Sequence, residues 1–350
     1  MLARLAENLF WAGRYVERAE DTTRIVDVTY HTLLESPPAE IEHTWRQVLD
    51  VLSLTDEYDG ELDGDRVVEF LVLDRDNFGS IHTSIANARH NIRSVRELVS
   101  TELWEVVNDL FLMLNSRDLR NDLIEQPYEL FGQLRRACMT IYGVSSETMP
   151  RDDGWRIMAV GRLLERAEMT CRLIDVRYAQ LVDLGGPSVR LWTTPANEDE
   201  ARAQADEASE ALQKFAQGAD RADFHQWVAV LKSASALEAY RRRYRASMDP
   251  ADVVEFLLLE PDLPRSVLSC LMGAMRQLEV LCGTQPTASS RRLGRTVASL
   301  QYRDVAELFE IGLHDLLESL QEEIAAVADG VADEFFRHHP GGPLRVVGAG

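Results

Sequence analysis

The sequence predicts an all-α protein, a helical bundle of about ten long and short helices built from two related halves. Apolar residues recur in steps of three and four over long stretches, which is the spacing of one helix face. No alternating run of β-branched residues is long enough to indicate a sheet. A segment near the start of the chain returns far downstream, and such a repeat indicates a duplicated structural unit.

The first helix is expected over residues 2–35, where one apolar stripe runs from Leu2 to Leu33. It should end before Pro37-Pro38, because proline cannot continue a helix. The same stripe returns at an offset of 148 and predicts a helix over residues 155–183. Between residues 13–28 and 161–176, ten of 16 positions are identical. We interpret this match as an internal repeat.

Shorter matches extend the repeat. Residues 43–49 resemble 225–231 at an offset of 182, and residues 67–71 resemble 253–257 at an offset of 186, which places Ser80 on Ser266. With the connectors that contain Gly and Pro as boundaries, four more helices are expected in each half. In the first half they cover 41–54, 65–73, 79–115 and 120–142; in the second they cover 221–247, 250–259, 264–283 and 289–328.

We therefore expect a single helical domain over residues 1–337, with halves at about 1–142 and 155–328. The second half carries an insertion over about 184–216, which is acidic and rich in alanine and predicts a loop followed by a helix near 200–217. Residues 338–350 contain a Pro-Gly-Gly-Pro run and are expected to form a flexible tail.

Composition excludes several classes of protein. The chain has 37 Lys and Arg against 58 Asp and Glu, a net charge of −21, which disfavours binding to a nucleic-acid backbone. The longest stretch without charge, residues 77–88, is shorter than the roughly 18 residues that a membrane span needs. The four cysteines form no C-x-x-C pair and are expected to be small buried hydrophobes. These features favour a cytoplasmic protein with no membrane association.

Charged residues gather on the two repeated helices. Arg14, Glu17 and Arg18 share one helix face, and the repeat holds Arg162, Glu165 and Arg166 at the same spacing. Apolar residues lie before and after these turns, so other helices should cover them. Buried charges must then pair with one another or with a ligand. The alternative is a solvated face in which each ion pair contributes little.

A second group of polar residues lies on the helix expected over 79–115. Arg89, Arg93 and Arg96, with Asn91 beside them, can share one broad side of that helix. If this side lies against the repeated helices, the guanidiniums would form a pocket for a carboxylate or a phosphate. They could equally serve only to balance the acidic excess elsewhere in the chain.

Four segments resemble the bacterial alpha-E domain family: residues 7–20, 70–81, 88–97 and 161–167. The resemblance covers roughly residues 1–325 and implies a helical domain of unassigned biochemistry. On this resemblance the family's Glu-Arg pairs fall on Glu17-Arg18 and Glu165-Arg166, and its Arg-rich helix falls on Arg89, Arg93 and Arg96.

The resemblance also implies partners. Members are typically encoded beside, or fused to, a circularly permuted ATP-grasp protein, often with a transglutaminase-like peptidase nearby, which suggests ATP-dependent peptide or amide-bond formation. This sequence departs from the family where Asp21 replaces the usual Asn, Phe78 the usual Pro and His90 the usual acid. Asp21 adds a negative charge, which weakens the case for an acidic ligand at the charged cluster.

Motifs for cofactors and metals are absent from the sequence. There is no G-x-x-x-x-G-K-[ST] loop, no H-E-x-x-H pair and no G-x-S-x-G turn. The acidic loop that begins at Asp59 has Phe70 where a calcium loop needs glutamate. We therefore expect neither a cofactor nor a metal.

Three functions follow as hypotheses. The preferred one is a non-catalytic partner of an ATP-grasp ligase that binds an acidic or peptide-like ligand through the Arg and Glu cluster. The second is an enzyme of the same pathway in which Glu17 or Glu165 acts as a base. The third is a structural scaffold in which the Arg–Glu contacts only stabilise the bundle. A solvent-reachable cleft at the repeated helices would favour binding or catalysis, whereas sealed and mutually paired charges would favour the scaffold.

Overall fold

A computed structural model describes residues 3–34, 38–116, 119–183, 221–244, 248–303, 308 and 312–336. Within these ranges all regular secondary structure is helical, which confirms the predicted all-α class. The expected insertion at 184–216, its helix near 200–217 and the tail at 338–350 lie outside the described residues.

The helices of the first part are α1 (Ala3–Leu33), α2 (Pro38–Leu52), α3 (Gly64–Val72), α4 (Ile81–Ser94), α5 (Thr101–Leu114), α6 (Leu119–Glu125) and α7 (Pro127–Thr148). Those of the second are α8 (Asp153–Asp183), α10 (Arg221–Ser233), α11 (Leu237–Tyr244), α12 (Pro250–Leu259), α13 (Val267–Cys282), α14 (Ala288–Gln301) and α16 (Leu313–Phe335). The predicted bounds of α1, α3, α8 and α12 agree with these to within two residues.

Two expected long helices in the first part are each divided in two. The helix predicted over 79–115 stops at Ser94, and α5 begins after Ser100, whose hydroxyl accepts a hydrogen bond from the Leu103 amide. This capping explains the new start. The helix predicted over 120–142 breaks before Pro127, which occupies the first turn of α7, a position that proline tolerates.

The second part has the same kind of difference. The helix predicted over 221–247 is interrupted at Ser235, whose φ of 52° is incompatible with a right-handed helix. The helix predicted over 289–328 ends at Gln301, and α16 starts after Gly312, where φ is 95°. In each case the apolar spacing in the sequence continues across the position where the backbone changes direction. A prediction from that spacing alone therefore joins two neighbouring helices into one.

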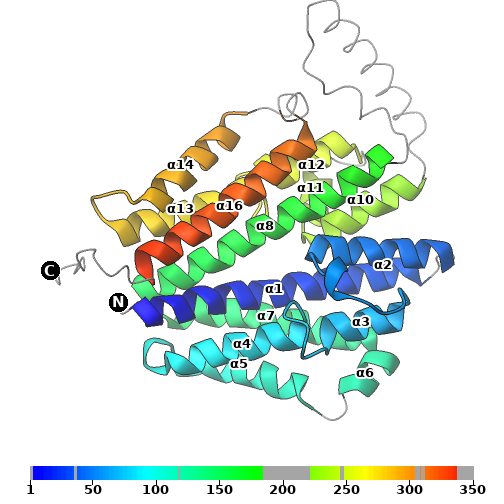
Figure 1. Ribbon diagram of the computed structural model, residues 1–350, viewed down its shortest axis with the longest axis horizontal. Helices are drawn as coiled ribbons and strands as arrows, with labels where there is room; N and C mark the ends of the chain where they lie inside the picture. Colours follow the sequence, from blue (N-terminus) through cyan, green and yellow to red (C-terminus); the bar gives the residue numbers. More distant parts are fainter. Residues whose placement is uncertain are drawn as a thin grey trace, which may run out of the picture.

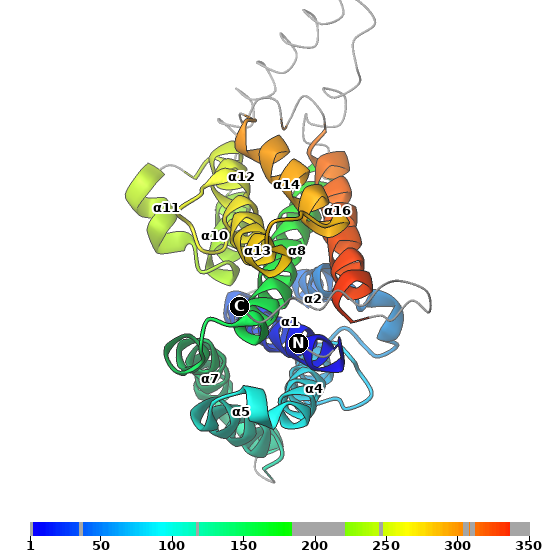
Figure 2. The ribbon, with the colours of Figure 1, turned by 90° about the vertical axis from the view of Figure 1, so that its left-hand side faces the viewer.

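The long helices α1 and α8 lie side by side in the middle of the molecule (Figure 1). On one side α1 packs against α4 and α7, and α5 closes that group; on the other, α8 packs against α13 and α16, and α14 closes the group (Figure 2). The contacts between the two parts also match: α2 of the first part contacts α8, and α10 of the second part contacts α1. This matching order of contacts agrees with the repeat in the sequence, while the duplication itself stays a prediction.

Two glycines allow α1 and α8 to approach closely. A Cβ atom on Gly13 would lie 2.2 Å from the Met158 carbonyl oxygen, and a Cβ on Gly161 would lie 2.2 Å from the Phe10 carbonyl oxygen. Both contacts are with backbone and cannot be relieved by a side-chain rotation. They are reciprocal, since Phe10 and Gly13 correspond to Met158 and Gly161 at the offset of 148.

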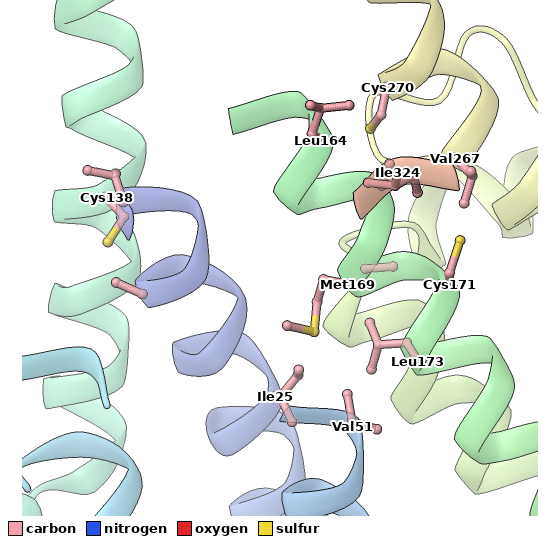
Figure 3. Packing of buried hydrophobic residues seen from close by; sticks show 14 of the residues in the cluster. Ile25, Val51, Cys138, Leu164, Met169, Cys171, Leu173, Val267, Cys270 and Ile324 are labelled. Carbon is pink, nitrogen blue, oxygen red and sulfur yellow. The ribbon is translucent and has the colours of Figure 1, made fainter. Parts of the chain in front are cut away.

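One apolar core runs through the helices on both sides of α1 and α8. Figure 3 shows part of it, with Met169 of α8 projecting toward Ile25 of α1 and Val51 of α2. The four cysteines are free; Cys138, Cys171 and Cys270 are buried, as predicted for small hydrophobes, and Cys282 is half-buried. Among the described helices, none combines the length and hydropathy that a membrane span requires.

Candidate functional site

The charged turns of α1 and α8 meet across the helix junction and form two separate clusters. The open cluster consists of Arg14, Arg18, Glu165, Glu168 and Arg172. The sealed cluster consists of Glu17, Glu20, Asp21, Arg24, Arg166 and Arg265. Each Glu-Arg dipeptide serves both clusters. Glu17 and Arg166 belong to the sealed one, whereas Arg18 and Glu165 belong to the open one, because consecutive residues on a helix point in different directions.

In the open cluster, Glu165 accepts hydrogen bonds from two arginines of α1. Its carboxylate oxygens lie 2.5 Å from Arg14 Nε and 2.7 Å from Arg18 Nε. Arg14 also reaches Glu168 at 2.7 Å, and Glu168 accepts a further hydrogen bond from Arg172. The side chains of Arg18 and Arg172 are 28% and 26% exposed, so solvent reaches this cluster.

In the sealed cluster, Arg166 holds Glu17 with two hydrogen bonds of 2.5 and 2.9 Å. Arg265 enters from the segment between α12 and α13 and lies 2.7 Å from Glu20 and 2.6 Å from Asp21. Glu17 is fully buried, and Arg166 is only 11% exposed. The guanidinium of Arg162 stacks over the Tyr142 ring beside this cluster, 4.9 Å from the ring centroid. Charges that are buried and paired in this way are typical of a structural network.

The electrostatics of the two glutamates do not suit a general base. Burial raises the pKa of Glu17, but the guanidiniums of Arg166 and Arg265 outweigh it and lower the pKa to about 2. Glu165 behaves alike: burial opposes ionisation, and Arg14 and Arg18 lower its pKa below the ordinary value. A base needs a pKa near the working pH and a free oxygen. The lowered pKa values of Glu17 and Glu165 do not meet the first need, and each oxygen of both already accepts a hydrogen bond from an arginine.

Arg265 was not among the residues predicted from the sequence, although its guanidinium completes the sealed cluster. The alignment of Ser80 with Ser266 places Gly79 opposite Arg265, so an arginine stands where the first half has glycine. That difference was the available signal. The direction of the Arg265 side chain could not be predicted, because it depends on how the segment between α12 and α13 packs against α1.

A pocket of about 220 Å³ opens beside the open cluster. Its charged lining comprises three carboxylates, of Glu57, Glu165 and Glu168, and two guanidiniums, of Arg18 and Arg172. Phe78, which is 74% exposed, also lines it. The lining thus offers groups of both signs to a ligand from solvent.

The second predicted group of residues lies apart from both clusters. On α4, Arg89 donates to Asn108 of α5 at 2.9 Å and stacks over Trp104 and Phe111, while Asn91 is half-buried and Arg93 is exposed. Arg96 is in a separate 3-10 turn (Arg96–Leu98) and donates to the Val99 and Ser100 carbonyl oxygens. A pocket here depended on this side of the helix lying against the repeated helices; the contacts of Arg89 and Arg96 are with α5 and with the segment just before it.

The family model that matches residues 1–336 is Alpha-E, described as a predicted alpha-helical domain with a conserved ER motif. The chain belongs to the Alpha-E family. The dipeptide Glu-Arg occurs in this chain at Glu17-Arg18 and Glu165-Arg166, the two positions that join the open and sealed clusters.

This Alpha-E chain is also similar to longer mycobacterial proteins. It is 23% identical to an uncharacterized protein of Mycobacterium bovis and 22% identical to one of Mycobacterium tuberculosis. Each alignment covers 94% of this chain but 36% of the relative, so the chain spans about a third of the length of the curated relatives it matches. No solved structure matches it. Over the described ranges, no group of three or more His, Cys, Asp or Glu side chains is arranged to hold a metal.

Asp21 is expected to make the Alpha-E chain less stable as pH rises. Burial raises the pKa of Asp21 to about 8, with the nearby carboxylates of Glu17 and Glu20 adding to it and Arg265 opposing it. Because this pKa lies above the ordinary value of 3.8, the folded state holds the proton more tightly than the unfolded state between about pH 4 and 8. Stability from Asp21 is therefore complete below this window and is lost across it.

Asp21→Asn removes this titration and keeps an acceptor for Arg265. Urea unfolding at several pH values measures the free energy of unfolding of both proteins. Relative to the natural protein, that of the variant should rise by up to about 1.4 kcal/mol per pH unit between pH 4 and 8. A difference in unfolding free energy that stays constant over that range would contradict the burial of Asp21 among carboxylates.

Proposed function

We propose that this Alpha-E chain is a non-catalytic helical partner of an ATP-grasp-type amide ligase and holds a peptide-like ligand in the pocket beside the open cluster. The observation that carries the proposal is the pocket of about 220 Å³, whose lining places carboxylates and guanidiniums within reach of solvent. A peptide or amino acid carries both charges, so a lining of both signs suits it better than a purely acidic ligand.

The state of the carboxylates supports a non-catalytic role. The sealed cluster has a structural role in this proposal, and Glu165 in the open cluster is held by two arginines. The alternative of an enzyme with Glu17 or Glu165 as base has less support, since both pKa values are lowered and both groups are paired. The pure scaffold explains the sealed cluster but leaves the charged pocket without a role.

The choice of partner is supported by the family resemblance and by the length of the relatives. The matched region is 36% of each mycobacterial relative, so a region similar to this chain occurs there together with further sequence. This fits a domain that works beside another. By the resemblance, that other component is a circularly permuted ATP-grasp protein, and a transglutaminase-like peptidase is a further candidate partner.

The test is to purify this chain with the neighbouring ATP-grasp ligase and to measure ligase turnover with and without it. We expect a complex and a higher turnover with the chain present. Arg172→Gln should reduce that stimulation about tenfold, the loss expected for one charge-assisted hydrogen bond, because Arg172 lines the pocket.

Arg46→Gln is the matched control, since Arg46 forms an exposed pair with Glu42 on α2 outside the pocket. It should stimulate the ligase as the natural chain does. Absence of both a complex and any change in turnover would refute the partnership, and equal loss in the two variants would refute the role of the pocket.

A further inference from the structure

The segments that lead into α4 and α13 have the same local structure. The Ser80 hydroxyl donates to the Asp74 carbonyl oxygen and accepts from the Thr83 amide. The Ser266 hydroxyl donates to the Glu260 carbonyl oxygen and accepts from the Ser269 amide. Each pair of partners differs by the same offset of 186. The residues just before the two serines, Gly79 and Arg265, therefore occupy equivalent positions.

At one of these positions an arginine fills the space beside α1. The guanidinium of Arg265 lies 3.3 Å from Glu17, 2.7 Å from Glu20 and 2.6 Å from Asp21. It is a cation that the fold itself supplies to three carboxyl groups.

At the other position there is no side chain, and the equivalent space is the pocket. The pocket is lined by Gly79 and by five residues that correspond, at the offset of 148, to residues around Arg265. These are Arg18, Thr22, Glu165, Glu168 and Arg172, which match Arg166, Thr170, Glu17, Glu20 and Arg24. The pocket is thus the vacant counterpart of the site that Arg265 occupies.

A second observation is the hydroxyl of Thr22, which is buried and has no hydrogen-bond partner within the described part of the chain. Its counterpart Thr170 donates to the backbone carbonyl oxygen of Arg265 at 3.0 Å. A buried hydroxyl without a partner is costly, and a ligand that offers it one would remove this cost.

The carboxylates of the pocket have hydrogen-bond acceptor capacity to spare. Three carboxylates and two guanidiniums line the pocket, and a third guanidinium, that of Arg14, pairs with Glu165 and Glu168 from outside the lining. Each oxygen of Glu165 and Glu168 accepts from one arginine, and a carboxylate can accept about four hydrogen bonds in all. Met169 stands where the sealed cluster has Asp21, so the pocket has one carboxylate fewer at this position, and the exposed Phe78 is also part of the lining. The volume is larger than a cavity of about 150 Å³ that admits benzene.

We infer that the pocket binds a ligand that carries a guanidinium group, as in free arginine or an arginine side chain of a peptide, placed against Glu165 and Glu168 where Arg265 lies in the sealed cluster. This inference rests on the proposed function, because it names the class of the peptide-like ligand. It also explains why Gly79 is useful here, since a longer side chain at this position would occupy the ligand's place.

Isothermal titration calorimetry with the full chain tests this inference, with L-arginine and L-citrulline as the probes. The two differ in that a charged guanidinium in arginine is a neutral urea group in citrulline. Arginine should bind at least about tenfold more tightly than citrulline, and L-glutamate should bind no better than citrulline. Citrulline or glutamate binding as tightly as arginine, or no heat from arginine at millimolar concentration, would overturn the inference.

Variants at position 79 locate the binding. Gly79→Ala adds a Cβ about 3.0 Å from flexible Leu54 methyl groups and should retain arginine binding within a few fold. Gly79→Arg should abolish arginine binding and raise the melting temperature above that of Gly79→Ala. Undiminished binding by Gly79→Arg would place arginine elsewhere and refute the inference.

The ligase assay separates this inference from the proposed function. If citrulline or glutamate bound tightly at the pocket while the chain still stimulated the ligase, the guanidinium ligand would be refuted and the partnership with the ligase would stand. If arginine bound at the pocket but the chain had no effect on the ligase, the partnership would be refuted and the guanidinium ligand would stand.

Discussion

Gly161→Ala is expected to destabilise the protein by about 3 kcal/mol or more, although alanine is the better helix former by about 1 kcal/mol. The added Cβ would lie 2.2 Å from the Phe10 carbonyl oxygen, so α1 and α8 must move apart. That movement would weaken every Arg–Glu contact across the junction. Chemical denaturation monitored by circular dichroism measures the change in the free energy of unfolding.

Gly143→Ala is the matched control, because Gly143 lies within α7 and a Cβ there would meet no atom within 4 Å. It should stabilise the protein by up to about 1 kcal/mol. Should Gly161→Ala prove as harmless as Gly143→Ala, α1 and α8 would not be in backbone contact at Gly161.

Glu17→Gln is expected to destabilise the protein by about 3 to 5 kcal/mol at neutral pH, since it leaves Arg166 and Arg265 buried with less compensating charge. The lowered pKa of Glu17 also predicts that this destabilisation depends on pH. The ionised Glu17 contributes its full stabilisation above about pH 4.5 and loses it as pH falls toward 2, so the two proteins should converge in acid. Urea unfolding at pH 7 and in steps below pH 4.5 gives both quantities.

Glu69→Gln removes a comparable pair at the surface, where Glu69 and Arg120 are 41% and 68% exposed. Its cost should stay below about 1 kcal/mol. If Glu17→Gln left the melting temperature unchanged and abolished an activity, Glu17 would be a catalytic base, and the structural role of the sealed cluster would be wrong.

Much of the fold could be predicted because the helix signals are long and periodic. The stripe on α1 and its return on α8 fixed both helices to within two residues. The breaks at Ser100, Pro127 and Ser235 were missed, because the apolar spacing continues through each of them. Pro127 was a visible signal, whereas the positive φ of Ser235 depends on tertiary packing and has no clear mark in the sequence.

The candidate site could be predicted only in part. Apolar residues before and after the charged turns indicated that other helices would cover Arg14, Glu17, Glu165 and their neighbours, and that these charges would be paired. The ion pairs between α1 and α8 agree with this expectation. Their division into two clusters could not be foreseen, since it depends on the crossing of the two helices. The arginines from Arg89 to Arg96 were assigned to one helix face, but the break after Ser94 turns Arg96 away from that helix.

The central claim is that the pocket beside the open cluster is the vacant counterpart of the Arg265 site. A crystal structure of the Gly79→Arg variant tests it most directly. We predict that the new side chain enters the pocket and that its guanidinium lies within hydrogen-bond distance of Glu165 and Glu168, as Arg265 lies against Glu17 and Glu20. A side chain that extends into solvent while the pocket stays empty would contradict the claim.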